Sequence, residues 1–156
     1  MKLTVAVLAV LLASPSQDEP QYTRKFEKKD LVATALDGGP KSAGATVISS
    51  AEQWASFLGQ CSPDVQTRLK KTKVDFGNEV LLTFALGPYR PSLDAWELSG
   101  TGFRGVIETA DRVLVHFRLV RSDAIRMEDS FPLFVARLPK TQKKIEFKKA
   151  TVHSGG

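Results

Sequence analysis

Few side chains in this sequence could take part in covalent catalysis. The chain has one cysteine, Cys61, and two histidines, His116 and His153. A nucleophilic cysteine or serine needs a neighbouring base, and zinc needs three or four close ligands. Because His116 lies in a run that alternates like a β-strand and His153 lies in a glycine-ended tail, we predict no catalytic residue, no metal site and no cofactor.

A small hydrolase or transferase is the enzymatic alternative. It would use Cys61 or a pair of neighbouring acids. The acid pairs are Asp94 with Glu97 and Glu128 with Asp129. Paired carboxylates hydrolyse glycosides only across a sugar cleft, and no other feature indicates one. For Cys61 we favour a buried free thiol, since free cysteine is among the most buried residue types. A disulfide to another chain and a reactive thiol stay open.

Residues 137–149 form a basic stretch with six cations and one acid. They are Arg137, Lys140, Lys143, Lys144, Lys148 and Lys149, with Glu146. Such a stretch can bind an anionic surface or nucleic acid. Lysines also protect an edge strand from pairing with other chains. We favour edge protection, expect no nucleic-acid partner, and keep binding to an anionic surface as an alternative function.

The elements that would position these residues follow from capping and periodicity. Ser50 and Gln53 have the capping-box spacing, and an apolar face after them predicts a helix that ends at Gly59. A second short helix is expected over 63–70. Strands are expected within 26–37 and at 45–48, 80–86, 93–99, 103–108, 112–121, 131–138 and 144–147. We therefore predict one α+β domain, with a mainly antiparallel β-sheet of about six or seven strands and one or two short helices packed on it.

The N-terminus has the order of a secretory signal peptide. Met1-Lys2 is positive, residues 3–13 are apolar except for Thr4, and small residues follow up to Ser16. The apolar run is too short to span a bilayer, which needs ~20 residues. We expect cleavage after Ser16 and an exported protein, periplasmic or extracellular, without a membrane span. The chain then divides into a signal peptide (1–16), a loosely ordered segment with one strand (17–44), a domain (45–149) and a flexible tail (150–156).

Three segments in order resemble a known family. They are Val47-Ile48-Ser49-Ser50 through Trp54, then Val74-Asp75-Phe76 with the strand 80–87, then residues 131–140 followed by Ile145-Glu146-Phe147. This order resembles the PrcB family, exported bacterial proteins named after an accessory subunit of a protease complex. The resemblance covers about residues 45–149. It implies a non-enzymatic exported module that supports or binds another protein, with a protease as one candidate.

The family has a loop of the form Arg-Pro-Thr-Gly-Gly-Tyr after its apolar strand. Here Arg90 and Pro91 match the first two positions, and Leu93-Asp94 replaces the two glycines. Tyrosine, tryptophan and arginine are enriched at interface hot spots. We therefore predict that the loop from Pro88 to Trp96 is the protein-binding surface. Its contact residues would be Tyr89, Arg90, Pro91 and Trp96. The alternative is that Trp96 belongs to the core and Tyr89 is an ordinary loop aromatic.

Overall fold

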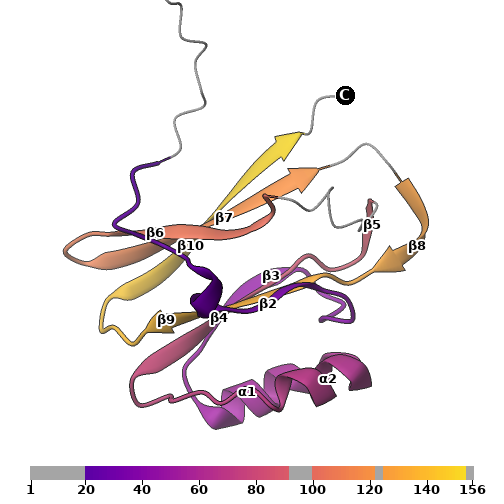
Figure 1. Ribbon diagram of the computed structural model, residues 1–156, viewed down its shortest axis with the longest axis horizontal. Helices are drawn as coiled ribbons and strands as arrows, with labels where there is room; N and C mark the ends of the chain where they lie inside the picture. The colour runs from indigo at the N-terminus through magenta and orange to yellow at the C-terminus, as the bar shows by residue number, and fades with distance from the viewer. Residues whose placement is uncertain (1–19, 92–99, 122–124, 154–156) are drawn as a thin grey trace, which may run out of the picture.

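Two four-stranded β-sheets and a pair of helices are stacked in three layers (Figure 1). This computed structural model describes residues 20–91, 100–121 and 125–153. The predicted α+β class with mainly antiparallel strands is confirmed, and the strands are shared between two sheets. The predicted signal peptide, Trp96 and the strand expected at 93–99 lie outside the described residues.

The first sheet, here called the outer sheet, has the strand order β1-β6-β7-β10. Its strands are β1 (Arg24–Lys25), β6 (Gly102–Glu108), β7 (Arg112–Arg121) and β10 (Lys144–His153). Strands β6 and β7 form an antiparallel hairpin. Strand β10 runs parallel to β7 along its whole length, from Lys144 beside Arg112 to His153 beside Arg121. The basic stretch therefore ends on the edge of a sheet.

The second sheet, the inner sheet, has the order β2-β9-β4-β3 and is antiparallel throughout. Its strands are β2 (Leu31–Leu36), β9 (Leu133–Pro139), β4 (Glu79–Ala85) and β3 (Gly44–Ile48). A short 3₁₀ helix, η1 (Lys28–Asp30), leads into β2. A separate two-stranded ribbon pairs β5 (Tyr89–Pro91) with β8 (Ile125–Ser130). The sequence predicted no strand where β8 lies.

Aromatic rings fill the space between the two sheets. Phe84 of β4 stacks on Phe117 of β7 with ring centroids 3.9 Å apart. Phe103 and Phe134 meet the edges of the Phe117 ring at 5.3 and 5.0 Å. Since side chains alternate along a strand, the intervening residues of β4 and β9 face the other side of the inner sheet. Both faces of that sheet are therefore buried.

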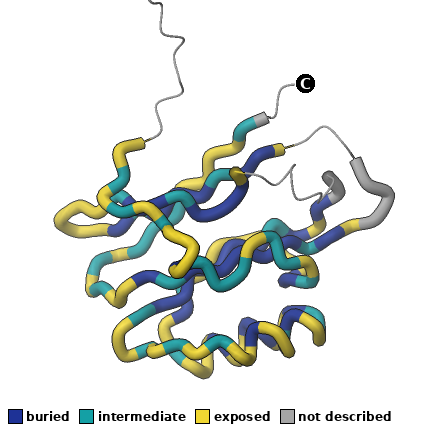
Figure 2. The backbone as a smooth tube through the Cα atoms, viewed as in Figure 1, coloured by how far each residue is buried: buried dark blue, intermediate teal, exposed yellow. Residues whose placement is uncertain are grey.

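The helices cover the other face of the inner sheet, as α1 (Ala51–Leu58) and α2 (Pro63–Leu69). The hydroxyl of Ser50 accepts a hydrogen bond from the Gln53 amide at 3.2 Å, so the predicted N-cap is present. The apolar sides of both helices pack on the sheet and form the second core with it. Its largest members include Ile48, Trp54, Phe57, Leu58, Leu69, Leu81 and Leu133. Exposed residues lie on the outward side of each helix (Figure 2).

Two predicted boundaries differ from the structure. Residues 150–153 continue β10 instead of starting a flexible tail, because the parallel partner β7 is ten residues long. The segment before residue 44 is also tied into the fold. Strand β2 pairs with β9, and the buried Asp30 carboxylate accepts hydrogen bonds from Arg24 and from the Glu27 amide. Strand pairing between distant segments produces both differences, and local sequence does not show it.

Candidate functional site

The predicted contact loop begins in the core. Tyr89 is 7% exposed and packs in the cluster between the two sheets. Its carbonyl oxygen accepts a hydrogen bond from the Ser130 hydroxyl at 2.8 Å, which ties β5 to β8. The buried ring of Tyr89 therefore does not fit the partner contact that the sequence predicts for it. The backbone of Arg90 and Pro91 belongs to β5, and Trp96 falls in the part that the structure does not describe.

Cys61 is a buried free thiol. It is 6% exposed, lies in the core between helices and inner sheet, and donates a weak hydrogen bond to the Phe57 carbonyl oxygen at 3.7 Å. Burial raises the pKa of the thiol to about 11. Because the thiolate is the nucleophile, a thiol with this pKa is almost entirely in its unreactive form at neutral pH.

His116 lies on the opposite side of the molecule from Cys61. It is on β7, on the face of the outer sheet that points away from the inner sheet, and it is 6% exposed. The ring of Tyr22 meets it edge-on at 5.3 Å. Burial, followed by the charge of Lys148, lowers the pKa of His116. The inner sheet and both cores separate this imidazole from Cys61, so the two cannot form a nucleophile–base pair.

The two acid pairs noted in the sequence fall mostly in parts that the structure does not describe. Asp94 and Glu97 lie outside the described ranges, and so does the Glu128 side chain. Within those ranges, no three histidine, cysteine, aspartate or glutamate side chains converge as a metal site would require. A charged cleft of about 280 Å³ lies beside β4 and β9. Its arginines already pair within the protein, Arg24 with Asp30 and Arg137 with Glu79, each at 2.7 Å.

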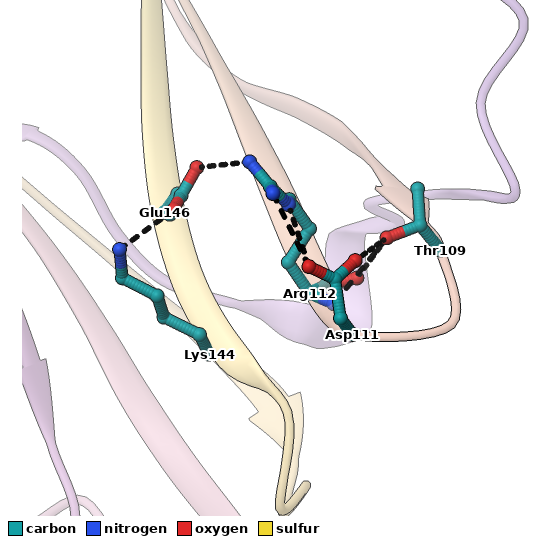
Figure 3. Close-up of polar contacts among 5 residues, drawn as sticks. All are labelled: Thr109, Asp111, Arg112, Lys144 and Glu146. Atoms are coloured by element: carbon teal, nitrogen blue, oxygen red, sulfur yellow. Dashed lines mark hydrogen bonds and ion pairs between the residues drawn. The ribbon is translucent and has the colours of Figure 1, made fainter.

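Ion pairs engage several cations of the basic stretch. Glu146 lies between Lys144 and Arg112, at 2.9 and 3.4 Å (Figure 3). Lys143 pairs with Glu108 at 2.7 Å. In the part of the chain that the structure describes, Lys148 and Lys149 have no ion-pair partner. Glu108 and Glu79 thus neutralise Lys143 and Arg137, whereas β10 itself keeps its surplus of positive charge.

Residues of the β6–β7 turn fix the position of the Arg112 side chain. Asp111 accepts hydrogen bonds from Arg112 at 3.2 and 3.4 Å and from the Thr109 hydroxyl at 2.9 Å (Figure 3). These bonds lower the pKa of Asp111. Glu146 also has a lowered pKa, mainly through its bond to Lys144. Both acids are therefore ionised at neutral pH, and the network joins β10 to the β6–β7 turn.

An open groove lies between the edge strand β3 and helix α1. It has a volume of about 400 Å³. Its floor includes the strand residues Thr46 and Ile48, and α1 contributes Gln53, Ser56 and Phe57 to its wall. All residues from 41 to 46 are exposed. Sequence reasoning missed this surface. The sequence did hold a signal, because a short strand of small uncharged residues follows the glycine-rich connector 38–44.

Comparisons with known proteins identify no relative. No family model, no curated protein and no solved structure matches this chain. The resemblance to the PrcB family therefore stays an expectation from the sequence.

Neither α1 nor α2, nor any other helical segment in the described ranges, has the length and apolarity needed to cross a bilayer.

Proposed function

We propose that this protein is a non-enzymatic, exported binding module that binds or supports another exported protein. The observation that carries the proposal is the groove beside β3. Its volume is within the range of about 300–1,000 Å³ typical of ligand sites, but it is open along a strand edge. A groove of this shape suits a segment of polypeptide better than a small molecule, which is normally enclosed.

The chemistry of the described side chains agrees with a binding role. Cys61 is buried and protonated, and His116 is remote from it. A hydrolase or transferase based on Cys61 is thereby disfavoured. The ion pairs of Arg112, Lys143 and Lys144 likewise disfavour an anionic surface as the ligand. The sequence resemblance to the PrcB family supports a protease as the partner.

Affinity capture in the native host tests this proposal. The full chain with a C-terminal tag should be recovered from the envelope or medium, with its N-terminus near Gln17. After mild crosslinking it should carry one exported protein in near-stoichiometric amount, identified by mass spectrometry. The matched control is the same tag on an unrelated exported protein.

Two results would contradict the proposal. One is recovery of the exported form with Met1 intact and no captured protein. The other is a hydrolase or transferase activity of the purified chain that Cys61→Ala removes without unfolding it.

A further inference from the structure

The outer edges of the two four-stranded sheets are protected to very different degrees. Proteins guard exposed edges with lysine, proline, bulges or very short strands. In the outer sheet, β10 carries lysines and β1 is two residues long. In the inner sheet, the pairing of β2 with β9 shifts register twice, and Ala35 of β2 has a φ of 51°. Three of these four described edges are therefore guarded.

Strand β3 has none of these guards. Its five residues pair with β4 in unbroken register, from Gly44 beside Ala85 to Ile48 beside Leu81. They include no charged residue and no proline. A methyl group added at Gly44 would meet nothing within 4 Å, so the backbone there borders open space. In an antiparallel edge strand, alternate residues direct their N–H and C=O groups away from the partner strand. These groups are available to another chain.

The groove lies beside this unguarded edge. Side chains alternate along β3, so Thr46 lies on the same side as Ile48, which packs in the helix-side core. The side chains that complete the groove, Gln53, Ser56 and Phe57 of α1 and Gln60 of the turn after it, are uncharged. A strand placed next to β3 would therefore direct every second side chain into a space with no charge of either sign.

We propose that β3 binds an extended, uncharged segment of the partner protein as an additional strand of the inner sheet. This inference rests on the proposed binding function and specifies its site. Five residues of the segment, about 17 Å at the usual rise of a strand, would pair with Gly44–Ile48. Main-chain hydrogen bonds supply affinity in this mode, and alternate side chains in the groove supply specificity.

A second copy of the chain is a poorer occupant than a foreign segment. If two β3 edges paired, each would offer the other's groove only Gly44 and Thr46 on that side of the strand, because Ile48 already packs in the helix-side core. These cannot fill a groove of about 400 Å³. Two copies would also each bring a net positive charge, which is +5 for the full chain. Larger uncharged side chains, such as leucine or methionine, fit the space and avoid burying a charge.

A random linear peptide library displayed on phage is the probe for this site. Selection on the full chain should enrich extended sequences with uncharged residues at alternate positions. Thr46→Lys places a long cation in the groove, and Thr34→Lys is the matched control, because Thr34 is an exposed threonine on the guarded edge β2 of the same sheet. Synthetic forms of the selected peptides are then titrated against both variants.

The expected result is a loss of affinity of at least 10-fold for Thr46→Lys and less than 2-fold for Thr34→Lys. The amides of β3 should gain protection from hydrogen exchange when peptide is added. Equal melting temperatures for the two variants exclude misfolding. If Thr46→Lys is unstable, Ala45→Pro repeats the test, because proline places a ring on the edge and has no backbone N–H. Peptides that bind Thr46→Lys as well as wild type, no enriched peptide, or a dimer that Thr46→Lys dissociates would each overturn the proposal.

The two proposals fail separately. If the exported partner is captured equally by wild type and Thr46→Lys, the protein is a binding module but β3 is not its site. If no partner is captured while the selected peptides bind at β3, strand addition stands and the proposed cellular role does not.

Discussion

At the scale of single residues, Tyr89 is the side chain whose role differs most from its sequence interpretation. A tyrosine between two prolines near a strand end has the composition of a contact loop, yet its ring is buried between the sheets. We expect Tyr89→Ala to destabilise the fold by about 3–5 kcal/mol, as for other large aromatic truncations. Tyr89→Phe keeps the ring and is the control. Denaturant unfolding measures both, and an unchanged midpoint for Tyr89→Ala would contradict the core role.

Cys61 should behave as an inert thiol in the folded protein. A pKa of about 11 lies roughly two units above that of an ordinary cysteine. At pH 8 the thiolate population, and with it the rate of alkylation by iodoacetamide, should be about 100-fold lower than in the unfolded chain. Burial slows the reaction further. The measurement compares native protein with protein in denaturant, and comparable rates in the two states would show a reactive, exposed thiol.

His116 should make stability depend on pH. Its pKa is lowered first by burial under Tyr22 and then by the Lys148 charge. In the unfolded chain it binds a proton near pH 6.5, whereas the folded chain resists protonation. Acidification from about pH 6.5 towards the lowered pKa therefore favours unfolding. The melting temperature should fall more between pH 7 and 5 in wild type than in His116→Gln, and parallel curves would remove His116 as the cause.

At the scale of elements, the two unequal sheet edges carry the main functional argument. The lysines of β10 oppose pairing with other chains, whereas β3 has no such residue. Without these lysines, the ten residues of β10 would form an edge that other chains can pair with. We expect Lys144→Thr, Lys148→Thr and Lys149→Thr together to cause concentration-dependent association, seen by light scattering. Lys28→Thr, Lys70→Thr and Lys71→Thr remove the same charge away from the sheet edges and serve as the control. Equal association of both variants would assign the effect to net charge.

At the scale of the whole molecule, the six cations within residues 137–149 overstate the affinity for polyanions. Three acids, Glu79, Glu108 and Glu146, pair with cations of the basic stretch. Binding to heparin should therefore be weak and should vanish near physiological salt, where the screening length is about 8 Å. Elution from a heparin column against salt measures this. Retention above ~0.3 M salt that the triple lysine variant abolishes would favour the anionic-surface alternative.

The local features of the fold could be predicted from the sequence because neighbouring residues determine them. Ser50 and Gln53 are three positions apart, so the cap of α1 depends on a single turn. The alternation of β7 and the apolar run of β4 likewise require only adjacent residues. The α+β class followed from these elements. Burial of Cys61 followed from its chemistry, since an unpaired cysteine behaves as a small apolar residue.

Tertiary structure alone decided which segments became partners. Alternation shows that one face of a strand is buried, but not against which layer, so one expected sheet became two with an aromatic core between them. The parallel pairing of β10 with β7 extended the strand to His153. The burial of Tyr89 and the open edge of β3 also depend on which strand lies alongside and which does not. Residues far apart in the chain set those contacts, and no local pattern encodes them.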